Sequence, residues 1–191
     1  RSEVSGSCGK NGSVELLQVM LGRGDVYADS RFVLKGNGSA LKADLGYLGQ
    51  KNQTVDINLA VDHRGKKTAS QINAAGALKD GAKKIFRGTI DFKTGSSDSV
   101  GSEQETVLML GEDAVNKTVP LILCAEENVE GTHGATIGEL DDDTLFYFGS
   151  RGIDRRTAEN ILARASIERL ARIVGDRELK EKIINGLNEE L

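Results

Sequence analysis

Cysteine, proline, tryptophan and histidine are scarce in this sequence of 191 residues, which holds two Cys, one Pro, no Trp and two His. The two cysteines, Cys8 and Cys124, lie far apart and form no Cys-x-x-Cys pair, so neither a disulfide framework nor a zinc knuckle is indicated. Reduced thiols fit a cytoplasmic protein, which is the location we expect. The chain begins with Arg1 rather than Met, so we expect a fragment or a processed form, and an organellar source stays open.

Long apolar runs and an excess of basic residues are also absent. No segment approaches the roughly 18 consecutive apolar residues that a membrane-spanning helix needs, so we predict no membrane partner. The 25 Lys and Arg residues are outnumbered by 29 Asp and Glu, and the two signs are interspersed. No large basic field is therefore offered to nucleic acid, which we do not expect as a partner.

Glycine is plentiful by contrast, with 23 residues where average usage predicts roughly 13. Between about residues 14 and 130, apolar side chains alternate with other residues, as in Val55, Ile57, Leu59 and Val61, and glycines separate the alternating segments. Alternation at period two is typical of strands that bury one face. Glycines between them favour tight turns with positive φ. The sequence therefore predicts an all-β body of short strands.

Three architectures suit such strands: a sandwich, a barrel or a stacked β-solenoid. The single proline, the aromatic content of 4% and the small-residue run over 72–78 favour a β-helix, whose narrow interior takes stacked Val, Ile, Leu and Ala. A strict repeat of about 20 to 50 residues would support this prediction, but the spacing between the strands is irregular.

The apolar period changes to 3.6 near the end of this β region. Asp141 is the predicted cap of a first helix, Gly152 its stop signal, and Asp154 the start of a second, amphipathic helix. We therefore divide the chain into a β-helix core domain, residues 1–138, and a C-terminal helical domain, residues 139–191. The helices are a candidate docking surface, although packing back on the β body fits the pattern equally.

The short motifs of common enzymes are incomplete here. Gly9-Lys10-Asn11 lacks both the hydroxyl residue and the first glycine of a nucleotide-binding P-loop. His63 follows Asp62, but an acyl-transfer site also needs an activated nucleophile, and no Gly-x-Ser-x-Gly occurs. We expect His63 to be a hydrogen-bonded turn or surface residue. No catalytic residue is predicted, and we do not expect an enzyme.

Two blocks of sequence resemble a known family. The first spans residues 130–153 and contains Thr-His-Gly-Ala-Thr, Leu-Asp, Leu-Phe-Tyr and Ser-Arg-Gly-Ile. The second spans residues 73–90 and contains Gly-Ala-Leu-Lys-Asp and Phe-Arg-Gly-Thr-Ile. Together with Asp62-His63, these blocks resemble the SufB/SufD family of iron-sulfur cluster assembly proteins, and the His-Gly-Ala-Thr form favours the SufD-like branch.

This resemblance implies a mostly β fold, a right-handed parallel β-helix followed by a small C-terminal α-helical region. It also implies a scaffold subunit of the Suf system that pairs with a SufB/SufD-type subunit, as a homodimer or a heterodimer, and docks the ABC-type ATPase SufC. The subunit would have no turnover, because ATP hydrolysis would reside in SufC. An iron-sulfur cluster would be bound transiently at the subunit interface, and not tightly by this chain alone.

The resemblance implies that His133 meets a cysteine of the partner at the cluster site, and neutral imidazole is a suitable iron ligand. Family members often have Cys directly before this His, whereas Thr132 stands here. Cys124 is a candidate substitute ligand, although a single Cys in a strand is more often a small buried hydrophobe. One His cannot hold a cluster alone, so we expect a site shared between chains.

For docking of SufC, the candidates in the helical region are Phe146, Tyr147, Arg151, Ile153, Ile161 and Leu162. Phe146 and Tyr147 fit equally well as core contacts that fix the helices to the β-helix. Two other functions stay open: a purely structural dimerisation module of the same complex, and a β-helix enzyme that acts on polysaccharide. The enzyme would need an exposed row of Asp and Arg, and we expect no such Asp cluster among the strands.

Overall fold

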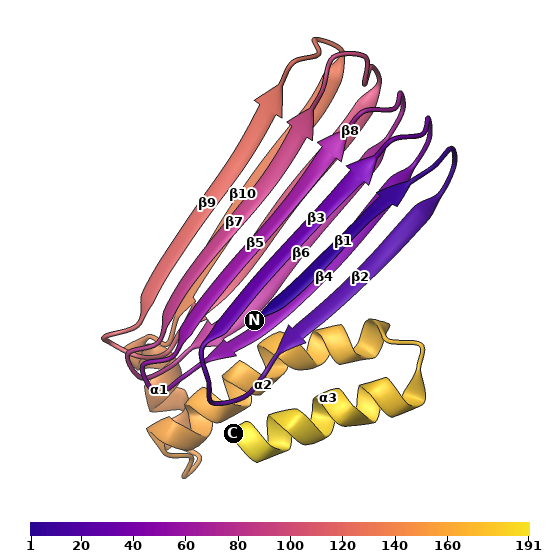
Figure 1. Ribbon diagram of the computed structural model, residues 1–191. Helices are drawn as coiled ribbons and strands as arrows, with labels where there is room; N and C mark the ends of the chain where they lie inside the picture. Colours follow the sequence, from indigo (N-terminus) through magenta and orange to yellow (C-terminus); the bar gives the residue numbers. More distant parts are fainter.

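The computed structural model describes residues 1–191 as ten strands followed by three helices (Figure 1). The strands are β1 (Ser2–Cys8), β2 (Ser13–Met20), β3 (Val26–Leu34), β4 (Ala40–Gly49), β5 (Thr54–His63), β6 (Ala69–Leu78), β7 (Lys83–Phe92), β8 (Ser99–Met109), β9 (Val115–Cys124) and β10 (Val129–Glu139). The helices are α1 (Asp142–Gly149), α2 (Arg155–Ile173) and α3 (Arg177–Glu190). The chain changes from strand to helix close to the point where the apolar period changes.

Successive strands alternate between two parallel sheets. Sheet A has the order β1-β3-β5-β7-β9, and sheet B has the order β10-β8-β6-β4-β2. Paired strands run parallel to one another in both sheets. Two strands therefore make one turn of a solenoid, and Figure 1 shows these turns stacked side by side. The arrangement confirms the predicted parallel β-helix and excludes the sandwich and the barrel.

The turns differ in length, which explains the irregular spacing in the sequence. The register places Ser2 beside Ala28, a separation of 26 residues, and Lys83 beside Val115, a separation of 32 residues. Loops tolerate such insertions because they lie outside the sheets. Each turn is one structural unit, although its length does not repeat strictly.

The inward faces of the strands fill the space between the two sheets. In β5, Val55, Ile57, Leu59 and Val61 are at most 1% exposed, while the residues between them are partly exposed. Burial of such a side chain contributes roughly 1.5–3 kcal/mol. The alternation in the sequence is thus the pattern of this narrow core.

Glycine allows the loops at one end of the solenoid to stack closely. A Cβ on Gly36 would lie 2.0 Å from the backbone nitrogen of Lys10, and a Cβ on Gly65 would lie 2.4 Å from the carbonyl oxygen of Gly36. Backbone atoms cannot move aside as the end of a side chain can, so no other residue fits there. Only four glycines have positive φ. Close approach of neighbouring backbone or side-chain atoms explains some of the other glycines.

Each helix begins behind an aspartate. Asp141, Asp154 and Asp176 each accept a hydrogen bond, at 2.8 Å, from the backbone N–H three residues ahead. Loss of such a cap typically costs about 1 kcal/mol. Gly152, with a φ of 75°, follows α1 as a left-handed stop. These contacts confirm the helix boundaries predicted at Asp141, Gly152 and Asp154.

Helices α2 and α3 pack on the outer face of sheet B, across the ends of its strands (Figure 1). Ile167 and Leu187 are fully buried in one cluster with Leu48 of β4. Gly46 permits this approach, because a Cβ there would lie 2.4 Å from Leu170 Cδ1. Packing back on the β body is therefore what the chain adopts. None of the three helices combines the length and the apolarity that crossing a membrane requires.

Candidate metal and partner site at the open end of the solenoid

The last turn of the solenoid is formed by β9 and β10, which are edge strands of sheet A and sheet B. Large apolar side chains of this turn are between 39% and 59% exposed, namely Val115, Val119, Leu121, Leu123 and Ile137. An unpaired edge strand with apolar side chains is a template for pairing with another chain. The last turn is therefore a candidate interface.

His133 lies on β10 and is exposed at this open end. The register places it beside Glu103 of β8, whose side chain is buried between the sheets. Neighbours in register on parallel strands share one face of the sheet. His133 is therefore on the interior face of the last turn, and it is exposed because no further turn covers that face.

Cys124 is exposed at the end of β9, so it is not the small buried hydrophobe that its residue type favoured. Gly131 and Ile122 face each other across the last turn, since a Cβ on Gly131 would lie 2.7 Å from Ile122 Cγ2. Cys124 lies two residues after Ile122 on β9, and His133 lies two residues after Gly131 on β10. The two residues are on opposite sides of this contact. At about 3.3 Å per residue, they are roughly 13 Å apart along the strands.

One chain therefore does not bring Cys124 and His133 together. No group of three or more His, Cys, Asp and Glu side chains is placed to hold a metal ion. Both residues are accessible to a second chain that docks on the open end.

A cluster of buried polar groups lies one turn below this end. Lys84 of β7 and Glu105 of β8 form an ion pair without exposed surface. Tyr47 donates a hydrogen bond to Glu105 Oε1 at 2.9 Å, and Lys84 Nζ donates to Thr118 Oγ1 at 3.1 Å. Burial lowers the pKa of Lys84, which the charge of Glu105 partly offsets. Burial, together with Glu105, raises the pKa of Tyr47.

Glu103 lies beside this cluster without a partner of its own. Its side chain is 4% exposed, yet it makes no hydrogen bond and no ion pair. The carboxylate occupies room that Gly88 leaves on the opposite sheet, where a Cβ would lie 1.9 Å from Glu103 Oε2. Burial and the charge of Glu105 raise the pKa of Glu103 to about 7, although Lys84 opposes them. A buried, perturbed acid of this kind marks a functional-site candidate.

Neither glutamate is among the site residues predicted from the sequence. The period-two spacing could have identified them, because Gly101, Glu103, Glu105 and Val107 occupy every second position of β8 and lie on one face of the strand.

Helix α1 has no fully buried residue, and two of its three aromatic side chains are exposed, while Phe148 is half-buried. Phe146 is 79% exposed and Tyr147 is 54% exposed, so the alternative that they are core contacts was wrong. The Arg151 guanidinium lies 3.7 Å from the centre of the Tyr147 ring. Of the other docking candidates, Ile161 is exposed, and Ile153 and Leu162 are half-buried. We call Phe146, Tyr147 and Arg151 the aromatic patch.

His63 is hydrogen-bonded, as expected, but the expected turn or surface position was wrong, because His63 ends β5 and is fully buried. Its imidazole lies 2.7 Å from Thr68 Oγ1 and 2.9 Å from Ser70 Oγ, and its centre lies 4.6 Å from that of the Phe92 ring. Burial lowers the pKa of His63 to about 4, although nearby aspartates oppose the shift. His63 is thus a neutral residue that ties strand ends together.

The outer face of sheet A carries a row of ion pairs, so the expectation of no Asp cluster was wrong. The pairs are Asp29–Arg31 at 3.3 Å, Asp62–Arg64 at 2.9 Å, Asp56–Arg87 and Asp91–Lys93. Glycoside hydrolysis usually needs one carboxylic acid and one free carboxylate. Each of these carboxylates is held by a cation, which disfavours that chemistry.

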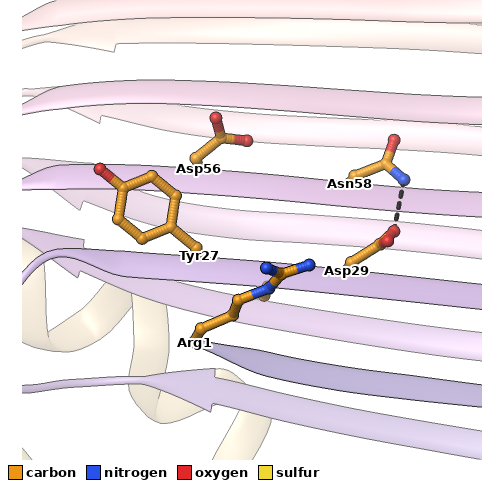
Figure 2. A pocket seen from close by; sticks show the side chains of 6 residues that line it. Arg1, Tyr27, Asp29, Asp56 and Asn58 are labelled. Carbon is orange, nitrogen blue, oxygen red and sulfur yellow. Dashed lines mark hydrogen bonds between the residues drawn. The ribbon is translucent and has the colours of Figure 1, made fainter.

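A surface pocket of about 410 Å³ lies beside this row. Figure 2 shows Asn58 beside Asp29 on neighbouring strands, and Asn58 Nδ2 donates to Asp29 Oδ1 at 2.6 Å. Asp56, across the pocket, is paired with Arg87. Both carboxylates of the pocket, Asp29 and Asp56, are thus already held by other side chains.

Comparisons with known proteins place these features in context. A family model described as "SUF system FeS cluster assembly, SufBD core domain" matches residues 2–166. The chain is 29% identical over 154 residues to the iron-sulfur cluster assembly protein SufD of Bacillus subtilis, which is 81% of this chain and 35% of that protein. It is 26% identical over 159 residues to SufD of Escherichia coli, covering 83% of this chain and 37% of that protein.

A chloroplastic iron-sulfur cluster assembly SufBD family protein of Arabidopsis thaliana is 25% identical over 150 residues, covering 78% of this chain and 27% of that protein. The chain thus spans about a third of the length of the curated relatives it matches. The match to the family model includes all ten strands, α1 and the first part of α2. It therefore includes the open end and the aromatic patch.

Proposed function

We propose an assembly role for this chain, which belongs to the SufBD core family of the SUF system of iron-sulfur cluster assembly. We infer that it is a scaffold subunit that pairs with a SufB/SufD-type subunit and docks an ABC-type ATPase of the SufC type. An iron-sulfur cluster, the cargo of assembly, is held transiently where the paired subunits meet. In this proposal the chain has no turnover, and it acts in the cytoplasm or in an organelle.

The observation that carries the proposal is the uncovered last turn. Strands β9 and β10 leave backbone N–H and C=O groups unpaired at the edges of both sheets. Val119, Leu121 and Leu123 are exposed beside that edge. A subunit with an equivalent open end can add strands to both sheets and bury these side chains, at roughly 25 cal/mol per Å² of apolar surface.

The same pairing would enclose His133, because its position faces the interior of the last turn. Iron-sulfur clusters are usually held by four protein ligands, among which His can replace Cys. We assign His133 as a ligand from this chain and Cys124 as a second candidate. The separation of roughly 13 Å along the strands means that further ligands come from the partner.

The aromatic patch, on α1 and the turn that follows it, is the proposed docking site for the ATPase. Aromatic and Arg side chains are enriched among residues that dominate binding energy at interfaces. Phe146 has few contacts to lose within this chain, since it is 79% exposed. The stacking of Arg151 on Tyr147 holds both side chains in place before docking, which reduces the entropy lost on binding.

A structural variant of this proposal also has support. In this variant the chain pairs and docks without touching iron, which is compatible with one chain not bringing Cys124 and His133 together. Anaerobic reconstitution of the paired subunits separates the two versions. Visible charge-transfer absorption that His133→Ala abolishes indicates a ligand, whereas unchanged absorption leaves His133 with a role in shaping the interface.

The first experiment tests pairing itself, by sedimentation velocity of this chain with a SufB-type subunit. Leu121→Lys places a charge on β9, and Tyr27→Lys is the matched control on the same outer face of sheet A, with exposure of 46% against 45%. We expect Leu121→Lys to weaken pairing at least about tenfold, equivalent to 1.4 kcal/mol. Equal effects of the two changes, or no pairing of the folded wild type, would contradict the proposal.

A further inference from the structure

The interior of the solenoid changes character toward its open end. One column of inward-facing residues in sheet B runs through Ala43, Ile72, Glu103 and His133 on successive turns. The first two members are apolar and fully buried. The last two carry a carboxylate and an imidazole, and the column ends where the interior opens to solvent, at β10 (Figure 1).

Glu103 is a nearly buried acid, 4% exposed, beside an ion pair that it does not join. Its carboxyl group has no partner, because Lys84 is already held by Glu105 and Thr118. Burying a polar group without a partner is unfavourable. The fold nevertheless makes room for this carboxylate, since a Cβ at Gly88 would lie 1.9 Å from Oε2. An orphaned group in a space shaped for it indicates a ligand-binding role rather than a packing role.

We propose that Glu103 and His133 together form a carboxylate–imidazole site for ferrous iron, with Glu103 as a second ligand supplied by this chain. The inference rests on the proposed role of the open end and adds a residue to it. Carboxylate and imidazole are the donors of non-haem ferrous sites. A divalent cation gives Glu103 the positive partner it lacks, while water, sulfide or a thiolate of the partner takes the remaining positions.

The backbone geometry suits this site. Neighbouring strands lie about 4.8 Å apart, and residues in register present their side chains to the same face. Glu103 and His133 are such a pair, on β8 and β10. Because His133 is exposed, an ion can reach the pair from solvent without separating the two sheets.

The test is anaerobic binding of ferrous iron to the full chain by isothermal titration calorimetry, with Co²⁺ as a spectroscopic probe of the ligands. We expect the wild type to bind one ion, and Glu103→Gln and His133→Ala each to weaken binding at least about tenfold. Glu130→Gln is the matched control, because it removes an exposed carboxylate from the same strand as His133. It should change the affinity less than about twofold.

A second variant tests the space around the carboxylate. Gly88→Ala displaces the carboxylate of Glu103 from the space beside Gly88. It should weaken iron binding about as much as Glu103→Gln does. Thermal unfolding checks that both variants fold. Wild-type affinity in Glu103→Gln, or no binding of ferrous iron by the wild type at millimolar concentration, overturns the inference. Because pairing is measured separately, loss of pairing with iron binding intact would instead remove the proposed function.

Discussion

Lys84 and Glu105 form an ion pair inside the solenoid in which neither side chain has any exposed surface. The pair links β7 of sheet A to β8 of sheet B, and Tyr47 and Thr118 add hydrogen bonds to it. Removing two charges from water costs several kcal/mol per ion, so such a pair forms only where its hydrogen bonds are satisfied. It therefore holds the two sheets in one relative position directly below the open end.

Breaking this pair from one side should destabilise the protein strongly. Lys84→Met leaves the carboxylate of Glu105 buried with Tyr47 and Thr118 as its remaining donors, and we expect a loss of about 3–5 kcal/mol in the free energy of unfolding. Denaturant titration measures it. The double change Lys84→Met and Glu105→Leu removes both charges and should recover most of the loss. A single variant within 1 kcal/mol of the wild type would contradict the burial of this pair.

The buried imidazole of His63 should make stability fall in mild acid. Its pKa is about 4 in the folded chain and about 6.5 when unfolded, so the unfolded chain binds more protons between these values. The contribution of His63 is fully present above about pH 6.5. As the pH falls to about 4, up to about 3 kcal/mol is lost. Denaturant titrations from pH 7 to pH 4 measure this loss.

The contribution of Glu103 to the pH dependence of stability has the opposite sign to that of His63. The two contributions therefore have to be measured separately. Its pKa is raised to about 7 in the folded chain, so Glu103 lowers stability as the pH rises from about 4.5 to 7. The informative quantity is the difference between the wild type and His63→Gln at each pH. If that difference does not shrink on acidification, His63 is not buried in its neutral form.

The stacking of the loops predicts that replacing two different glycines by alanine will have very different effects on stability. Gly65→Ala places a Cβ 2.4 Å from the backbone oxygen of Gly36, whereas Gly9→Ala meets no atom within 4 Å. We expect Gly65→Ala to cost more than about 2 kcal/mol of unfolding free energy, and Gly9→Ala to stay within about 0.5 kcal/mol. Thermal unfolding of both variants compares them. Equal midpoints would show that the loops do not stack in this way.

Local patterns in the sequence were sufficient for much of the fold. The alternation from Val55 to Val61 marks the buried face of β5 without knowledge of its neighbours, because period two is a property of one strand. The caps at Asp141 and Asp154 are equally local, since each contact reaches only three residues ahead. His133 and the aromatic patch were found through the family resemblance rather than through physical pattern.

Features that depend on register were not predictable. The sequence alone does not show that Glu103 and Glu105 of β8 face inward, because charged residues in a strand usually face solvent. Only its pairing with β6, which sets Glu103 beside Ile72, shows that both glutamates point inward. His63 was misplaced for the same reason, as no local pattern shows that Phe92 and Ser70 enclose it.

Deleting α1, α2 and α3 is a poor test of ATPase docking, because it would also uncover buried residues of the β-helix such as Leu48, Ala77 and Leu110. A point change in the aromatic patch avoids this problem. Phe146→Ala should shift the free energy of unfolding by less than about 0.5 kcal/mol, since the side chain is 79% exposed. Ile173→Ala is the control, because Ile173 is an apolar residue that is 52% exposed and lies at the C-terminal end of α2, outside the aromatic patch.

If α1 docks a SufC-type ATPase, Phe146→Ala should raise the Kd for that partner roughly 30-fold, which corresponds to about 2 kcal/mol for an interface anchor. Ile173→Ala should leave the Kd within about twofold, because it lies outside the aromatic patch. Calorimetry with the purified ATPase measures both. Since folding and docking are read separately, a stable Phe146→Ala variant with wild-type affinity would move the docking site away from α1, whereas an unstable one would show that Phe146 supports the fold.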